Sequence, residues 1–194
     1  MDRTDADDAT RRAVLRAASE LLVREGLAGL TNRRIADLAG CSTMAIYSRF
    51  GSKGGILDAL YREGVETLSA AQAEVEVDPE GIDEIIGLSL AYRRTALEYT
   101  GHFQILFGPI PDWEPSNELR ADLHEIYIRF RSACERAVEV GGAPGPAEQL
   151  CVALFAHCHG HVVLGLAGYG QRQCDVVRSY LDGVRRCLGQ PSSE

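Results

Sequence analysis

The spacing of the apolar residues is the feature that most restricts the fold of this chain. Between residues 8 and 26, Val14, Ala17, Ala18, Leu21 and Leu22 recur at intervals of three and four, which places them on one face of an amphipathic helix. The same spacing recurs along the 194 residues, and no stretch alternates apolar and polar residues as a half-buried strand does. The sequence therefore predicts an all-α fold of about nine helices.

Capping residues and glycines indicate where these helices begin and end. The N-cap candidates are Thr31, Ser42, Ser52, Asp78 (followed by Pro79) and Ser116, and the stop candidates are Gly26 and Gly40. The predicted helices are 8–26, 31–40, 42–49, a long helix after Ser52, 80–99, 102–107, a helix from Ser116 to the glycines at 141–142, 147–169 and 173–188. Ile35, Leu38 and Ala39 are expected to face inward in the second helix, and Ile46 and Phe50 in the third.

Net charge alone argues against a nucleic-acid partner, because the whole chain carries −8 at pH 7. The distribution of charge argues otherwise: residues 24–53 sum to +3 and the remaining residues to −11. Lys53, the only lysine of the chain, lies at the end of this basic stretch. A local basic surface can attract nucleic acid even when the chain as a whole is acidic.

Residues 30–53 (LTNRRIADLAGCSTMAIYSRFGSK) carry the most specific pattern of the chain. Two short helices joined by a tight turn form a helix-turn-helix, whose second helix enters the major groove of DNA. The stretch resembles the DNA-binding domain of the TetR family of transcriptional repressors in its Leu-Thr start, its Ile-Ala-x-x-Ala-Gly core, Ser42 at the turn, and Ile46-Tyr47-x-x-Phe50-x-x-Lys53. The alternative is a solvated, mildly basic three-helix segment with Tyr47 in its core.

The resemblance implies a role in DNA binding for eleven residues. Thr31, Tyr47 and Lys53 resemble phosphate contacts, while Arg33 suits a bidentate bond to guanine. The full set is Thr31, Asn32, Arg33, Ser42, Thr43, Met44, Ala45, Tyr47, Ser48, Arg49 and Lys53.

The resemblance further implies a second domain that binds a small-molecule effector and dimerises. Apolar walls with a few polar tips are typical of a ligand pocket, and also of an ordinary core. The candidate ligand-binding residues are Tyr92, Tyr99, His102, Phe103, Phe107, Trp113, His124, Tyr127, Phe130 and His159. The predicted division is a DNA-binding domain at 1–55 and an effector-binding and dimerisation domain at 56–194.

Residues 149–171 contain no Asp, Glu, Lys or Arg and are long enough to span a membrane. Their histidines, cysteines and glycines favour a helix buried inside protein on most sides. His159-Gly160 and the residues up to Gly168 also resemble the eighth helix of a TetR-like effector-domain subgroup. In the family the last two helices usually form the homodimer, so we expect burial against a second copy and no membrane contact.

Cys151, His157, Cys158, His159 and His161 raise a second hypothesis, a metal sensor or a metal-dependent helical enzyme. His157 and His161 share a helix face, but Cys158 points about 100° away from His157, so packing or hydrogen bonding is favoured over a metal site.

The chain lacks the G-x-S-x-G, phosphate-loop and H-E-x-x-H motifs. We therefore expect no cofactor and no enzymatic activity. The N-terminus has no apolar signal segment, so a cytoplasmic location is expected. The leading interpretation is a repressor that a small molecule releases from a palindromic operator. A DNA-binding module without an effector is a further alternative.

Overall fold

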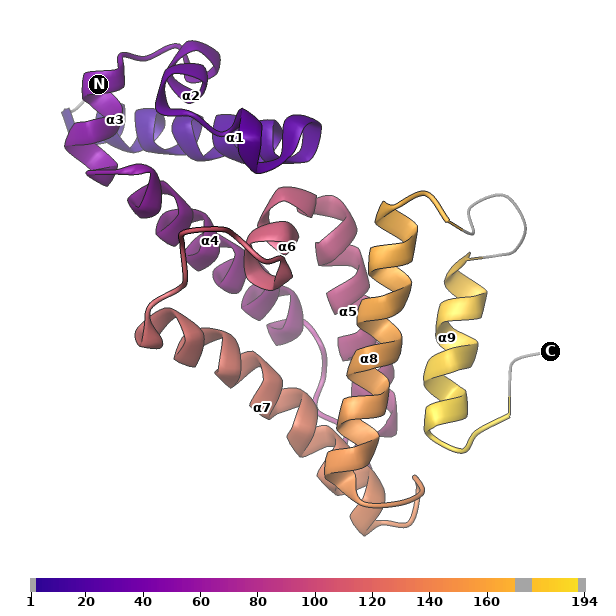
Figure 1. Cartoon of the computed structure of the whole chain (residues 1–194). Helices are drawn as coiled ribbons and strands as arrows, with labels where there is room; N and C mark the ends of the chain where they lie inside the picture. The colour runs from indigo at the N-terminus through magenta and orange to yellow at the C-terminus, as the bar shows by residue number, and fades with distance from the viewer. Residues whose placement is uncertain (1–2, 170–175, 192–194) are drawn as a thin grey trace. The chain divides into compact units, whose positions relative to one another are not determined.

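The computed structural model describes residues 3–169 and 176–191, with side chains from residue 7 onward. Within these ranges the chain forms nine α-helices and no strands, which confirms the all-α prediction (Figure 1). The helices are α1 (Arg3–Gly29), α2 (Asn32–Ala39), α3 (Thr43–Phe50), α4 (Lys53–Ala73), α5 (Ile82–Glu98), α6 (Thr100–Phe107), α7 (Asn117–Glu139), α8 (Ala147–Leu166) and α9 (Val176–Cys187).

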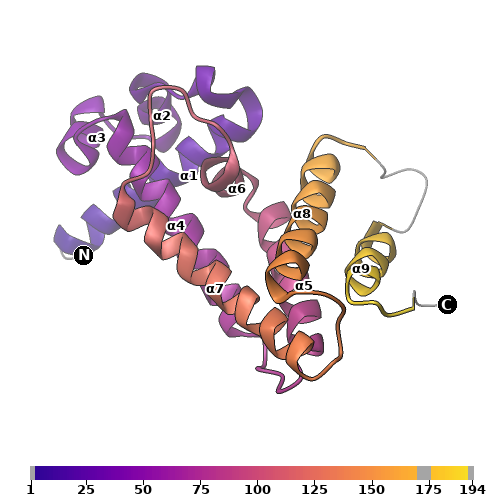
Figure 2. The same ribbon diagram turned by 60° about the horizontal axis from the view of Figure 1, so that its bottom comes forward.

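The described residues fall into two compact units. The first, here called the head unit, lies within Met1–Glu66 and Tyr99–Arg120, and the second unit lies within Thr67–Glu98 and Ala121–Glu194. In the head unit α1 packs against α2 and α6, and α2 packs against α3. In the second unit α5 packs against α8 and α9, and α8 packs against α9 (Figures 1 and 2).

The apolar residues that predicted the first helix form the centre of the head unit. Val14, Ala17, Ala18, Leu21 and Leu22 are all buried, each with at most 4% of its surface exposed. Gly26 interrupts α1 with a φ of 66°, a conformation that glycine adopts without steric cost. The predicted helix end therefore coincides with a break, after which one more turn continues to Gly29.

One predicted detail is wrong, and two helix ends lie two or three residues from where they were expected. Leu38 is 44% exposed rather than inward, and Ala36 takes the buried position beside Ile35. The fifth helix begins at Ile82, not Glu80, because Asp78 accepts bonds from the backbone N–H groups of Glu80 and Asp83 and closes a turn instead. The eighth helix ends at Leu166 rather than residue 169.

The second-unit helix α8 is long and apolar enough to cross a membrane by length and composition, a test that core helices of soluble proteins also pass. In the single chain this helix is not buried on most sides, and its predicted burial against a second copy stays a prediction. Val152, Val163, Leu164 and Leu166 are exposed on it, while Leu150, Leu154 and Val162 are buried. Of the ninth helix as predicted, residues 173–175 lie outside the described residues.

Candidate functional site

The turn between α2 and α3 is built from two side-chain caps. The Thr31 hydroxyl accepts a bond from the backbone N–H of Arg34 at 3.4 Å, and the Ser42 hydroxyl accepts one from Ala45 at 3.1 Å. Between them Gly40 ends α2 in the left-handed conformation, with a φ of 68°. Both predicted N-caps are therefore confirmed, and the two eight-residue helices are held at a fixed, tight turn.

The outer face of α3 is exposed along its length. Ile46 is fully buried and holds the inner face, whereas Met44 and Tyr47 are 76% and 53% exposed. Thr43 and Ser48 are also exposed, and Ala45 is half-buried. The alternative that placed Tyr47 in the core is therefore wrong. An exposed aromatic hydroxyl beside small polar and apolar side chains is suited to contact a nucleic-acid surface.

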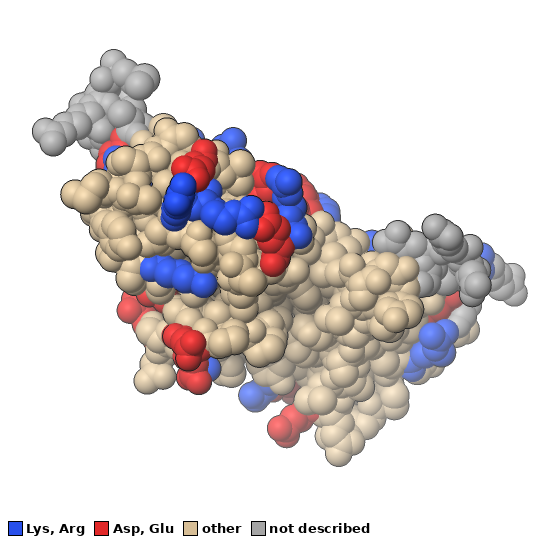
Figure 3. Space-filling view, turned by 45° about the horizontal axis from the view of Figure 1, so that its top comes forward, with Lys and Arg blue, Asp and Glu red and all other residues tan. Residues whose placement is uncertain are grey.

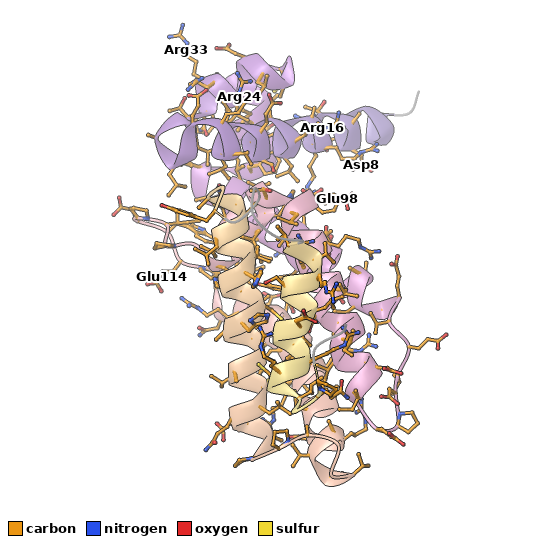
Figure 4. The ribbon with its side chains drawn as sticks, turned by 90° about the vertical axis from the view of Figure 1, so that its right-hand side faces the viewer. Asp8, Arg16, Arg24, Arg33, Glu98 and Glu114 are labelled. Carbon is orange, nitrogen blue, oxygen red and sulfur yellow. The ribbon has the colours of Figure 1, made fainter. Side chains whose placement is uncertain are left out.

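Two cations of the basic stretch 24–53 are left without an ion-pair partner among the described residues. They are Arg33, on α2, and Lys53, the first residue of α4. In Figure 4 the Arg33 side chain points away from the ribbon. The neighbouring cations are engaged: Arg34 pairs with Glu25, and Arg24 with Glu20 at 2.9 Å. On the face shown in Figure 3, Lys and Arg side chains accordingly lie among Asp and Glu side chains.

Arg49 and Asn32 were expected to contact DNA, but polar atoms of both side chains face the protein. Arg49 pairs with Asp7 at 2.5 Å and donates to the carbonyl of Ala45, and its side chain is only 21% exposed. The Oδ1 atom of Asn32 is buried and has no hydrogen-bond partner in the described structure. The Arg49 guanidinium and the Oδ1 atom of Asn32 are therefore not presented outward in this conformation.

The ten candidate ligand-binding residues divide between the two units. The head unit contains Tyr99, His102, Phe103, Phe107 and Trp113; the second unit contains Tyr92, His124, Tyr127, Phe130 and His159. Tyr92, His102, Phe103 and Phe130 are buried, while Tyr99 and His124 are exposed. The ten candidates therefore do not all lie within one unit.

In the second unit Tyr92 and His159 form the most defined polar contact among these candidates. The Tyr92 hydroxyl lies 2.8 Å from Nδ1 of His159, and the ring of Phe155 packs against both. Burial raises the pKa of Tyr92 and lowers that of His159, so a neutral tyrosine donating to a neutral imidazole is favoured. Sequence reasoning missed Phe155, because its helical spacing is no different from that of a core residue.

In the head unit two candidates bond to carboxylates of α4. His102 Nε2 lies 3.0 Å from Glu63, and Trp113 Nε1 donates to Asp58 at 3.0 Å. The hydrogen bond from His102 lowers the pKa of Glu63. Trp113 also lines an open hollow of about 430 Å³ together with Leu57, Ile110, Asp112 and Lys53. Both α6 and the segment that follows it are thus hydrogen-bonded to α4.

The Cys/His cluster that suggested a metal site does not converge on one point in the structure, although the rings of His157 and His161 lie 5.1 Å apart. His157 Nε2 donates to the carbonyl of Tyr180 at 2.9 Å, whereas His159 Nδ1 lies 2.8 Å from the Tyr92 hydroxyl. Cys151 and Cys158 are both buried. Among the described residues no group of three or more His, Cys, Asp or Glu side chains is placed to hold a metal ion. The metal-dependent alternative is therefore not favoured.

Comparison with known proteins assigns both parts of the chain to one family. Residues 14–60 match the family model described as bacterial regulatory proteins, tetR family, and residues 85–186 match the tetracyclin repressor-like C-terminal domain. The class C tetracycline repressor protein of Escherichia coli is 35% identical over 133 residues, which cover 69% of this chain and 57% of that protein. The aligned segment thus spans little more than half of that relative.

A second relative aligns over more of its length. The HTH-type transcriptional regulator TtgR of Pseudomonas putida is 28% identical over 163 residues, covering 78% of this chain and 77% of that protein. Among solved structures, the TetR family transcriptional regulator PfmR of Thermus thermophilus superposes with a TM-score of 0.76 at 18% identity, covering 91% of this chain and 97% of the other. Two family models and these relatives agree along the chain. This chain belongs to the TetR family of bacterial regulatory proteins.

Proposed function

We propose that this chain is a transcriptional regulator that binds a palindromic DNA operator through α2 and α3 and releases it when a small molecule binds. The observation that carries the proposal is that Ile46 of α3 is buried while Met44 and Tyr47 of the same helix are exposed. Such a helix is anchored on one face and free on the other, as a recognition helix must be. Membership of the family supports the same role.

Within this proposal some residues of the head unit contact the edges of DNA bases, and others contact the phosphates. Arg33, one of the two cations without an ion-pair partner among the described residues, suits a guanine edge, and Thr43, Met44 and Ala45 lie at the start of the recognition helix. Tyr47 and Lys53 anchor phosphates, together with the N-terminal ends capped by Thr31 and Ser42. Ser48 is exposed and suits a further backbone contact, whereas Asn32 and Arg49 would first have to reorient.

A homodimer formed through α8 and α9 would cover the exposed apolar side chains of α8. Gly160 and Gly165 support this arrangement, since a Cβ atom at either would meet no other atom within 4 Å in the single chain. Helices that cross at such small residues can approach closely. A dimer would also present two recognition helices to successive major grooves about 34 Å apart.

The dimer would adopt conformations that differ in the distance between its two head units, and the effector would shift their populations. A ligand that favours the wrong separation weakens operator binding by its difference in affinity between the two states. Tyr92, His159 and Tyr127 of the second unit are the polar groups that we assign to ligand recognition. The division at residue 55, the cytoplasmic location and the absence of catalysis belong to the same proposal.

Selection of operators from a pool of random duplexes, using the purified chain, tests this function. We expect palindromic sequences with half-sites about one helical turn apart, and affinity that falls steeply with salt. Arg33→Ala should flatten base preference at one position per half-site by about 1–3 kcal/mol, because a bidentate guanine contact is lost. Arg24→Ala, which removes an exposed cation already paired with Glu20, is the matched control. Failure to enrich any sequence would contradict the proposal.

A further inference from the structure

The N-terminal part of α1 contacts the last turn of α3 through two pairs of side chains. Asp7 and Arg11 are four residues apart, so they lie on the same face of α1. An Asp7 carboxylate oxygen lies 2.5 Å from Nη2 of Arg49, and the Arg11 guanidinium lies 5.9 Å from the centre of the Phe50 ring. Arg49 is the one basic residue of α3. An acidic residue of α1 therefore pairs with the one cation of the recognition helix.

The Arg49 guanidinium is folded back onto the protein. Its Nη1 donates to the carbonyl of Ala45 at 3.1 Å, one turn earlier in the same helix. Its Nε is buried and has no hydrogen-bond partner in the described structure. A buried N–H group without a partner destabilises the conformation that contains it. The folded-back conformation of Arg49 therefore depends on its two other bonds, and the ion pair with Asp7 is the one assisted by two opposite charges.

The Asp7 carboxylate neutralises a charge that DNA could otherwise use. Arg49 directly follows Tyr47 and Ser48, two exposed residues of α3. A guanidinium binds phosphate and carboxylate with the same fork of N–H groups, so a phosphate has to displace the carboxylate. Asp7 and a DNA phosphate are therefore competing partners of Arg49.

We propose that Asp7 is a positioning residue that holds Arg49 away from DNA, so that the N-terminal part of α1 limits operator affinity. This role rests on the proposed function, because the released Arg49 is assigned to a phosphate of the operator. The Asp7 side chain is 61% exposed, and ion pairs this exposed contribute little to folding stability. The pair can therefore break while α1 and α3 stay folded.

The exchange of Arg49 between a carboxylate and a phosphate has two measurable consequences. Loss of an exposed competing ion pair should change affinity by up to about fivefold. One additional phosphate contact should steepen the slope of log affinity against log salt by about 0.9. The slope is the more specific of the two, because a change in folding stability alone does not add a phosphate contact.

The first measurement involves no DNA. The full-length chain is treated briefly with phenylglyoxal, which modifies arginine, and the modified peptides are quantified by mass spectrometry. Asp7→Asn should raise the rate of modification at Arg49 several-fold. Arg24, which is paired with Glu20, is the internal reference and should react at an unchanged rate. Asp8→Asn is the matched control, because it removes the same charge from the adjacent exposed residue, whereas the ion pair of Arg49 is with Asp7.

The second measurement is affinity for an operator duplex selected with the unaltered chain, over a range of salt concentrations. Asp7→Asn should bind about two- to fivefold more tightly, with a slope steeper by about 0.9. Asp8→Asn should leave the slope unchanged, and Asp7→Glu, which keeps the carboxylate, should bind as the unaltered chain does. When Arg49→Ala has removed the guanidinium, adding Asp7→Asn should have no more effect than adding Asp8→Asn.

Weaker operator binding by Asp7→Asn, or a salt slope equal to that of Asp8→Asn, would overturn the role of Asp7. The two measurements also distinguish this role from the proposed function. If Arg49 becomes reactive in Asp7→Asn but no variant binds any duplex, the proposed function fails, and the role of Asp7 in DNA binding fails with it, while the ion pair stands. If all variants bind the operator with one common slope, only the role of Asp7 is refuted.

Discussion

Glu84→Gln should lower the free energy of unfolding of this protein by about 3 kcal/mol, as expected when one partner of a buried charge network is removed. The Glu84 carboxylate is 1% exposed and accepts bonds from Arg129, Arg136 and the backbone N–H of Asp78. Gln offers one acceptor oxygen in place of two and turns an N–H₂ donor toward groups that can only donate. Urea unfolding at pH 7, followed by circular dichroism, measures the change.

Glu80→Gln is the matched control, because Glu80 is exposed and lies four residues before Glu84 in the chain. It should change the free energy of unfolding by less than about 0.5 kcal/mol. Arg129 also donates to the carbonyl of Val75 at 2.6 Å, so the network joins the loop after α4 to α5 and α7. Equal stabilities of the two variants would show that Glu84 does not hold these elements together.

Gly55→Ala should destabilise the junction of α3 and α4 by about 1–3 kcal/mol, the usual cost of overpacking a closely packed site. A Cβ atom at Gly55 would lie 1.9 Å from the carbonyl oxygen of Phe50 and 3.0 Å from its carbonyl carbon. Backbone cannot yield as a flexible side chain does, so the chain must shift between Phe50 and α4. The recognition helix ends at Phe50, and operator affinity should therefore fall with stability.

The adjacent glycine provides the control. A Cβ atom at Gly54 would make only ordinary contacts, at 3.4 Å to the Ser52 hydroxyl and 3.8 Å to Trp113. Gly54→Ala should leave stability unchanged or raise it by up to about 1 kcal/mol, since alanine is the better helix former. Thermal unfolding and DNA titration of both variants distinguish a tight backbone contact from a general intolerance of alanine in this turn.

Local signals explain why much of the head was predictable from sequence. The caps at Thr31 and Ser42 and the stops at Gly26 and Gly40 act over three or four residues, and the structure confirms them. Leu38 was misplaced because a two-turn helix with several apolar residues does not define one inner face. The start of α5 was misplaced because Asp78 and Gly81, whose φ is 79°, form a turn before the helix.

Contacts between distant residues could not be predicted from the sequence. Glu84 of α5 and Arg129 of α7 are 45 residues apart in sequence, and only folding joins them in an ion pair. The same is true of Phe155 beside Tyr92 and His159. Composition suggests a pocket among the aromatic residues of the middle region, but it cannot tell which of them belong to which unit.

The most direct test of DNA binding by this face is the operator affinity of the double variant Tyr47→Ala, Lys53→Ala. Both side chains are exposed on the head unit, and we assign both to phosphate contacts that do not read sequence. Their removal should weaken binding by about tenfold or more on every operator sequence and reduce the slope of log affinity against log salt by about 1. Arg94→Ala, which removes an exposed cation of the second unit, should bind as the unaltered chain does. Full operator affinity in the double variant, with its fold intact by circular dichroism, would contradict the assignment of this face to DNA.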